Sequence, residues 1–309
     1  MRPWWMLIGW ALAACLPLLL GSGYAVQVAD LALLNALAVL GLNFVTGYAG
    51  QVNFGQAGFA GIGAYVTALG ALAGLPFWLA LLAALVVAAV ASLALGLPTL
   101  RLRSFYLAMA TIGFGEIVHL VLLHWESVTG GSSGLRQIPP IGIGRFVVGT
   151  DAQAWWVLLA VLALAVLVAG RVRRSWLGRA MIATADAEIA ASLTGLDTLR
   201  VKLVALMLAA VYAALSGGLY AGYVRYVSPD QFGNQQAVLL FSMLVLGGTG
   251  SIGGCLIGAA VLTVLPEALR FLHAWYMVLY GAGVVAIVLF MPDGVVGAAR
   301  RLGRRLGVG

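Results

Sequence analysis

Ionisable side chains inside apolar stretches are the first residues of this sequence that could do chemistry. Glu116 and His119 lie three residues apart, so on a helix they share one face and each could neutralise the other. Such a pair could relay protons or could fix the packing of two helices, and we favour the packing interpretation. Asp30 and Glu267 are the other ionisable residues in or near the end of such stretches.

Nucleophilic, metal and nucleotide chemistry find little support. The segment 131–134 matches the loose pattern of an intramembrane serine protease, with His119 or His124 as the base, but it lies in a predicted external loop and not in a span. The three histidines offer no zinc ligand set, and the two cysteines have no paired spacing. With no phosphate-binding loop motif and one lysine, Lys202, the chain is expected to bind no metal or cofactor, so any ATP and Mg must be used by another subunit.

The amino-acid composition indicates the kind of structure in which these ionisable and polar residues lie. Of the 309 residues, 63% are hydrophobic and 9% charged, and the mean hydropathy is +1.05. Water-soluble domains normally carry about 25% charged residues, so the sequence predicts an all-α polytopic membrane protein in which residues 1–309 form a single transmembrane domain. The 41 glycines suit close helix packing and interrupted helices, which favours helices over a β-barrel.

Apolar runs bounded by Pro, Gly, Trp or Arg predict about ten transmembrane helices. A helical span needs roughly 20 apolar residues, and the runs approach or reach this length. The predicted spans are 4–21, 26–46, 55–74, 77–98, 104–124, 154–170, 203–224, 236–250, 252–270 and 275–291. The first run also resembles a signal peptide, but an uncleaved first span is the simpler interpretation.

Charge and tryptophan positions predict the orientation in the membrane. Seventeen basic residues stand against ten acidic ones, and most of the basic residues fall in alternate loops, which places the N- and C-termini in the cytoplasm. The basic residues form no patch with interleaved aromatics, so a nucleic-acid partner is not expected. Tryptophans at the predicted span ends suit contact with membrane lipid. Residues 125–153 then form a turn-rich external loop, and residues 171–202 form a cytoplasmic loop.

Two glycine-rich segments, 47–58 and 247–254, interrupt the predicted spans at similar places in the two halves. Irregular backbone at membrane depth survives only where it is buried in protein or lines a cavity, so the paired breaks point to a translocation path. Close helix crossing explains the glycines equally well, but neighbouring amide side chains favour a polar lining. The predicted path residues are Asn43, Gln51, Asn53, Gln56, Glu116, Thr249 and Ser251.

The cytoplasmic loop contains an amphipathic segment. Its apolar residues are Ile182, Ile189, Leu193 and Leu196, and its polar row is Thr184, Glu188 and Ser192. We expect a short helix at the cytoplasmic surface, with Asp186 and Glu188 near its start, where the helix dipole favours negative charge, and Gly195 after its end. Composition alone favours simple contact with lipid headgroups.

Several segments together resemble the permease subunits of branched-chain amino acid ABC importers, of the LivM type. The resemblance covers about residues 35–295 and depends on the order of several modest motifs. They are LNFVTGYAGQVNFGQAGFAGIGAY at 42–65, ATIGFGEI at 110–117, TGGSSGL at 129–135, GRA at 178–180, EIAA with Gly195 at 188–195, and LGGTGS at 246–251.

This resemblance implies a permease that moves branched-chain or related hydrophobic amino acids across the bacterial cytoplasmic (inner) membrane and is not itself an enzyme. It implies three partners: cytosolic ATPase subunits, a second related permease and an external solute-binding protein. The segment 188–195 resembles the coupling loop that docks on the ATPase, although residues 181–186 are less charged than is usual in the family. The implied coupling residues are Arg179, Asp186, Glu188, Ala190, Ala191 and Gly195.

Other functions stay open at this point. Members of the same family carry aromatic amino acids, urea or short amides, so the resemblance leaves the exact substrate undetermined. An ion-coupled secondary transporter would work without ATP. The coupling loop, together with the lack of a credible proton relay or of a nucleophile with its base, favours the ATP-driven importer.

Overall fold

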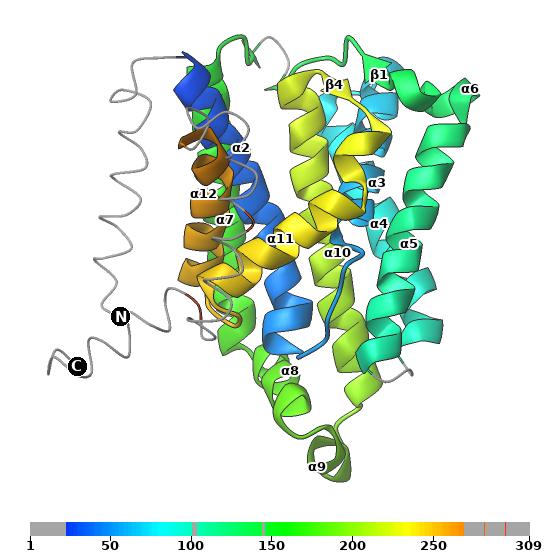
Figure 1. The fold of residues 1–309 in the computed structure, drawn as a ribbon, viewed down its shortest axis with the longest axis vertical. Helices are drawn as coiled ribbons and strands as arrows, with labels where there is room; N and C mark the ends of the chain where they lie inside the picture. Colours follow the sequence, from blue (N-terminus) through cyan, green and yellow to red (C-terminus); the bar gives the residue numbers. More distant parts are fainter. Residues whose placement is uncertain (1–22, 101–103, 144–145, 269–280, 282–293, 295–309) are drawn as a thin grey trace, which may run out of the picture.

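The computed structural model describes residues 23–100, 104–143 and 146–268, together with the single residues 281 and 294. A helix occupies each predicted span from 26–46 to 252–270 (Figure 1). The predicted spans 4–21 and 275–291 lie, apart from Gly281, outside the described residues.

Helices form most of the described chain. They are α2 (Gly23–Leu42), the π-helical turn η1 (Asn43–Tyr48), α3 (Gln56–Leu72), α4 (Phe77–Thr99), α5 (Ser104–His124), α6 (Glu126–Thr129), α7 (Asp151–Arg174), α8 (Trp176–Asp186), α9 (Glu188–Leu193), α10 (Thr198–Val224), α11 (Asn234–Gly247) and α12 (Ile252–Ala268). The 3-10 turns are η2 (Gly131–Ser133) and η3 (Pro229–Phe232). The strands are β1 (Leu135–Arg136), β2 (Gly142–Ile143), β3 (Phe146–Val147) and β4 (Tyr226–Val227).

Not all of these helices are long enough to cross a membrane. The 5 that are long and apolar enough among the described residues are Gly23–Tyr48, Phe77–Thr99, Tyr106–His124, Asp151–Arg174 and Thr198–Val224. α11 has 14 residues, which at about 1.5 Å per residue gives about 21 Å against a hydrocarbon core of about 30 Å. A polytopic helical protein is therefore confirmed, while ten crossings and cytoplasmic termini stay predictions.

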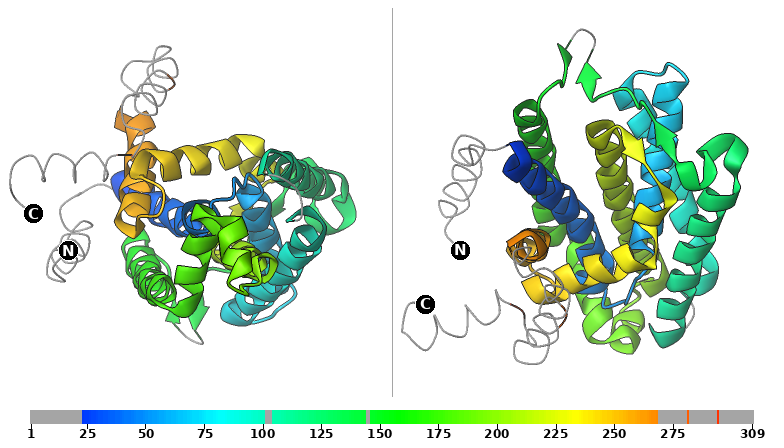
Figure 2. Two further views of the ribbon diagram at one scale, coloured as in Figure 1. Left: turned by 90° about the horizontal axis from the view of Figure 1, so that it is seen from below. Right: turned by 45° about the horizontal axis from the view of Figure 1, so that its top comes forward.

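α10 lies in the interior of the bundle and packs on α2, α3 and α4 (Figure 2). Glycine permits the closest of these contacts, because a Cβ on Gly217 would lie 1.9 Å from the carbonyl oxygen of Ala60. A Cβ on Gly63 would lie 2.3 Å from the Cα of Ala214. The backbones of α3 and α10 thus touch, so part of the glycine excess serves close helix crossing.

The loop 125–153 has structure of its own. β1 pairs with β4 in antiparallel register, Leu135 opposite Val227, and β2 pairs with β3. Gly134 has a φ of +65° and a Cβ there would lie 2.0 Å from the carbonyl oxygen of Val227, so only glycine fits this approach. The predicted helical class is thus confirmed with four two-residue strands added: β1 pairs with β4 after α10, whereas β2 and β3 pair within the loop, so that backbone groups are satisfied.

The two ends of the bundle differ. α8 and α9 project from one end, whereas α6, β1 and β4 lie at the other (Figure 1). The projecting end carries the arginines at the end of α7, together with Arg179 of α8. The segment 171–202 therefore contributes to this projecting end, and its cytoplasmic location stays a prediction.

Candidate functional site

The two glycine-rich breaks meet inside the bundle. η1 ends α2 with wide-turn hydrogen bonds, such as Ala49 N to Phe44 O at 3.1 Å, and the chain then runs without helix to α3. The second break separates α11 from α12, and its Gly250 N donates to Oδ1 of Asn43 at 2.8 Å. A Cβ on Gly47 would lie 2.6 Å from Gly250 N. The two breaks predicted from the sequence therefore form one irregular region, while their role as a translocation path stays a prediction.

Four predicted path residues lie within this region and are buried. They are Asn43, Gln51, Asn53 and Gln56, each no more than 6% exposed. Gln56 Nε2 donates to Ala38 O at 2.8 Å and to Ala209 O at 3.2 Å, which ties α3 to α2 and α10. Oε1 of Gln51, Nδ2 of Asn53 and Oε1 of Gln56 have no hydrogen-bond partner among the described residues. These amides contribute to packing and also leave polar atoms unsatisfied in the interior.

The other predicted path residues occupy different surroundings. Thr249 is exposed, and Ser251 is nearly buried, with its Oγ accepting from Gly254 N at 3.2 Å. Glu116 lies half-buried on α5, where its Oε2 accepts from Nδ2 of Asn234 at 2.7 Å. The structure therefore places Glu116 beside α11 and does not gather the seven residues around one point.

The expected pairing of Glu116 with His119 is wrong. His119 Nδ1 instead makes a hydrogen bond with Pro229 O at 3.1 Å, while Glu116 binds Asn234. The ion pairs of the described chain are Asp197–Arg200 and Glu188–Lys202, and neither contains Glu116 or His119. The segment η3–α11 packs against α5 and offers each side chain its own partner, which spacing along α5 does not reveal.

The predicted coupling helix consists of two helices. α8 ends at Asp186, Ala187 has a non-helical backbone (φ −155°, ψ 82°), and α9 begins at Glu188. Asp186 is thus at the end of α8 and not near a helix start, which corrects that prediction, while Glu188 is in a first turn as expected. The turn at Ala187 brings Glu188 into an ion pair with Lys202 at the start of α10.

Gly195 ends α9 as predicted. Its N–H donates to Ser192 O at 3.0 Å, and Leu196 N donates to Ala191 O at 3.4 Å, the two bonds of a Schellman motif. Gly195 has a φ of +84°, and a Cβ there would meet nothing within 4 Å. The requirement for glycine is therefore conformational and not steric.

α9 presents an apolar tip at the projecting end of the molecule. Ile189 is 79% exposed and Leu193 is 83% exposed, and they lie one turn apart on the same face. Ala190 is exposed, whereas Ala191 is buried toward the bundle. Arg179 on α8 is exposed and its Nη1 donates to Arg174 O at 3.0 Å. Exposed apolar side chains of this size favour contact with a partner over contact with water.

The α8–α9 unit contacts the first break directly. A Cβ on Gly50, whose φ is +68°, would lie 2.9 Å from the Cβ of Ala185 near the end of α8. The end of α7, which leads into this unit, also reaches the break: the guanidinium of Arg173 lies 5.8 Å from the centre of the Tyr48 ring at the end of η1. Neither these contacts nor the ion pair of Lys202 was predicted from the sequence, although the single lysine beside the amphipathic segment is a usable signal.

These features indicate the class of membrane protein. The structure is a helical membrane protein with two broken segments in contact and a projecting helical unit that touches one of them, which is the architecture of a transport permease driven from one side. Comparison with known families gives the same result. Residues 24–288 match the family described as "Branched-chain amino acid transport system / permease component", and the chain belongs to this family.

Curated relatives of the chain are also permeases. The "High-affinity branched-chain amino acid transport system permease protein LivM" of Escherichia coli (strain K12) is 34% identical over 94% of this chain and 73% of its own length. The corresponding LivH of the same strain is 31% identical over 85% of this chain and 91% of its own length. The "Autoinducer 2 import system permease protein LsrC" of Yersinia enterocolitica is 28% identical over 63% of this chain and 54% of its own length. No solved structure matches the chain.

Proposed function

We propose that this chain is the membrane-spanning permease subunit of an ABC importer for branched-chain or related hydrophobic amino acids, and that it has no catalytic role of its own. The names of the LivM and LivH relatives, which are branched-chain amino acid permeases, support this substrate class. The partners are two cytosolic ATPase subunits that use ATP and Mg, a second related permease, and an external solute-binding protein. The protein works in the cytoplasmic (inner) membrane of a bacterium, with its termini and α8–α9 on the cytoplasmic side.

One observation carries the mechanism: the contact of α8 with the first break at Ala185 and Gly50. A subunit that hydrolyses ATP can act on a membrane path only through an element that is rigid at the surface and touches the path. α8 meets both conditions, because it is helical to Asp186 and its Ala185 lies against Gly50. Movement of α8–α9 would therefore displace the first break together with the second break bonded to it.

The ATPase would dock on α9 and the exposed side of α8. Ile189 and Leu193 supply the apolar contact, and Arg179 and Asp186 flank it with charge. Ala190 faces the same solvent, whereas Ala191 and Glu188 hold α9 on the bundle. Gly195 fixes the turn that returns the chain to α10. ATP-driven closure of the two ATPases would then switch the path between outward and inward access.

Purification of the tagged chain with its native partners tests the proposal. Recovery of ATPase subunits in stoichiometric amounts, and ATP-dependent vesicle uptake of leucine, isoleucine or valine, is the expected result. Aromatic amino acids, urea and short amides belong in the same uptake panel, because preferential uptake of one of these would refute the substrate class. Recovery of the chain alone, active without ATP, would refute the importer and favour an ion-coupled secondary transporter.

A pair of variants tests the docking surface. Ile189→Asp places a charge in the apolar contact and should abolish copurification of the ATPases while leaving membrane insertion intact. Val128→Asp, at a 37% exposed apolar residue of α6 at the other end, is the matched control and should leave copurification unchanged. Equal ATPase recovery with both variants would refute docking at α9.

A further inference from the structure

The charge on Glu116 has no opposite charge in the part of the chain that the structure describes. The side chain is half-buried on a membrane-spanning helix, and its one hydrogen bond comes from the neutral amide of Asn234 at 2.7 Å. Neither ion pair of the described residues includes it. A carboxylate at membrane depth is expensive unless it pairs with a cation or faces a water-filled cavity. In the described chain Glu116 thus has a neutral hydrogen-bond partner, Asn234, and no cationic one.

An aromatic pair lies on the same face of the molecule. The ring centres of Phe54, in the first break, and Phe241, on α11, are 4.8 Å apart, and both residues are half-buried. Phe54 N donates to Oγ1 of Thr111 at 3.1 Å, which attaches this part of the break to α5 just before Glu116. These rings form an apolar surface that remains partly open to solvent.

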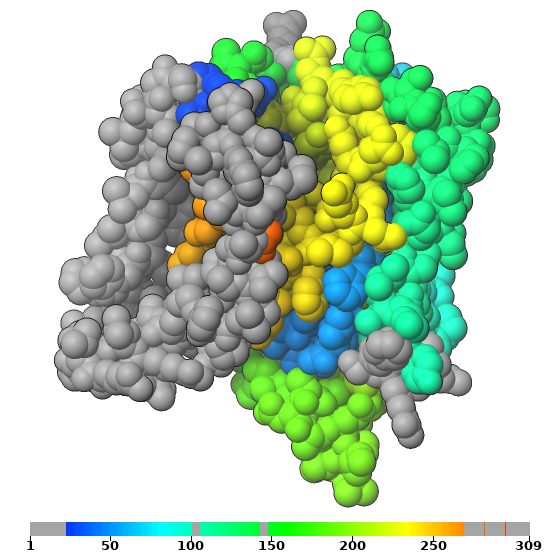
Figure 3. All heavy atoms as spheres, viewed as in Figure 1, coloured from blue at the N-terminus to red at the C-terminus, as the bar shows by residue number. Residues whose placement is uncertain are grey.

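Gly115 lies where the carboxylate and the aromatic pair come together. A Cβ on Gly115 would lie 3.6 Å from Oδ1 of Asn234 and 3.8 Å from the carbonyl oxygen of Phe54. A methyl group at this position would make ordinary contacts with both oxygen atoms, so α5, α11 and the first break approach one another closely at Gly115. In Figure 3, α11 and α5 lie side by side on the surface that faces the viewer.

α11 arranges the polar and the apolar groups along one line. Asn234, Val238 and Phe241 follow at intervals of four and three residues, so they share a helix face. Seven residues at about 1.5 Å each separate Asn234 from Phe241 by about 10 Å along the axis. Val238, between them, is 55% exposed. The face thus runs from a carboxylate and an amide at one end to apolar side chains at the other.

We propose that this face is half of a binding site for a zwitterionic amino acid with an apolar side chain. Glu116 accepts hydrogen bonds from the ammonium group of the ligand, and Val238, Phe54 and Phe241 contact its side chain. The carboxylate of the ligand is bound by the second permease, which faces this surface and closes the site. This inference rests on the proposed function and identifies the substrate-contacting residues of the path.

Direct binding measurements give the affinity of the permease for each ligand without a contribution from the solute-binding protein. The complete complex of both permeases and the ATPases, in nanodiscs and without the binding protein, is titrated with radiolabelled leucine. The same titration uses 2-hydroxy-4-methylpentanoate, which replaces the ammonium group of leucine by a hydroxyl. The unmodified complex should bind leucine at least about tenfold more tightly, as expected for one charge-assisted hydrogen bond.

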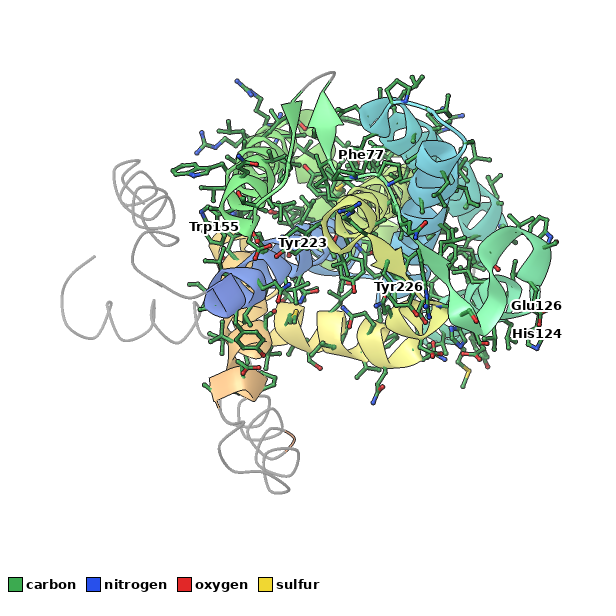
Figure 4. All side chains as sticks on the ribbon, turned by 90° about the horizontal axis from the view of Figure 1, so that it is seen from above. Phe77, His124, Glu126, Trp155, Tyr223 and Tyr226 are labelled. Atoms are coloured by element: carbon green, nitrogen blue, oxygen red, sulfur yellow. The ribbon has the colours of Figure 1, made fainter. Side chains whose placement is uncertain are left out.

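Two variants and a control assign this preference to residues. Glu116→Gln should weaken leucine binding about tenfold and leave binding of the hydroxy acid unchanged. Phe241→Ala should weaken leucine binding more than alanine binding, because only leucine reaches the aromatic pair. Glu126→Gln, which neutralises an exposed carboxylate at the outer edge of the bundle next to His124 (Figure 4), should change neither affinity.

Each contrary result has a distinct meaning. Equal binding of leucine and the hydroxy acid by the unmodified complex overturns the ammonium site, whether or not any variant folds. Separation of the two permeases in the Glu116→Gln complex overturns it in favour of an ion pair between the subunits. Leucine binding by an intact Glu116→Gln complex at full affinity overturns it as well. Failure to recover ATPase subunits with the unmodified chain refutes the proposed function instead.

Discussion

Reversing the charge at Glu188 should release the α8–α9 unit from α10, so that its movement no longer displaces the first break. Glu188 is the first residue of α9, and its carboxylate forms an ion pair with Lys202 of α10. The Lys202 side chain is 9% exposed and that of Glu188 is 53% exposed, so the lysine is the buried member of the pair. In the Glu188→Lys variant two ammonium groups would occupy this position, and Lys202 would lose its partner.

The free energy lost with this ion pair can be estimated from the unequal burial of its two side chains. Removal of one member of a fully buried pair costs roughly 3–5 kcal/mol, and removal from an exposed pair costs about 0–1 kcal/mol. Because one partner is buried and the other half-exposed, we expect the substitution to weaken the attachment of α9 to α10 by about 2 kcal/mol. This reduces the population in which α9 lies on α10 about thirtyfold. The loss concerns only the position of α9, so α10 should still insert and fold.

The assay compares ATP hydrolysis and leucine uptake in liposomes that contain the complete complex. Glu188→Lys should lower the uptake per ATP hydrolysed to less than about a tenth of the unmodified value, in line with the expected loss of α9 attachment to α10. The charge swap Glu188→Lys with Lys202→Glu restores opposite charges and should recover much of the coupling. Arg200→Gln is the matched control, because it removes the exposed ion pair with Asp197, whose side chains are 84% and 50% exposed.

Normal uptake per ATP from a well-expressed Glu188→Lys variant would refute this reasoning. A swap that fails to restore coupling, although the protein inserts normally, would show that the residues act separately. A loss of the same size in Arg200→Gln would indicate a general electrostatic effect at this end of the bundle and not the specific pair.

Three further substitutions test the contacts that join the elements. Gly50→Val forces a φ of +68° on a β-branched residue whose Cβ would lie 2.9 Å from Ala185, so uptake should fall severalfold with insertion unchanged, and normal uptake would contradict the contact. Gln56→Leu removes the donor to two buried carbonyl oxygens and should lower the temperature at which the detergent-solubilised protein aggregates, by a loss of about 1–3 kcal/mol. Gly217→Leu would drive a side chain into the Ala60 carbonyl, 1.9 Å from the Cβ position, and should abolish accumulation of folded protein, whereas wild-type levels would exclude this close crossing.

Features that depend on local sequence could be predicted. α4 begins at Phe77 and α5 ends at His124, the bounds expected from the apolar runs, because the limits of a span depend on hydropathy along the chain. The breaks also coincide with the glycine-rich segments, and Gly195 ends α9, since positive φ angles strongly favour glycine. Each of these results rests on the chemistry of neighbouring residues.

Features that depend on contacts between distant segments could not be predicted. The break at Ala187 accompanies the ion pair of Glu188 with Lys202, and no residue near Ala187 signals a helix end. The partner of Glu116 is Asn234, 118 positions away, whereas its neighbour His119 bonds to the backbone of Pro229. Helical spacing identifies the side chains that can meet within one helix, but it does not identify a competitor from another helix.

Because the sequence has a single lysine, chemical modification of Lys202 can report the movement of α9. The amine of Lys202 is held in the ion pair with Glu188. An amine-reactive reagent therefore has one lysine side chain to modify in this chain, besides any free α-amino group, and it should react there faster when Glu188 has moved away. The rate of that modification, followed by mass spectrometry through a cycle of ATP binding and hydrolysis, reports the release of α9 from α10 without an engineered label.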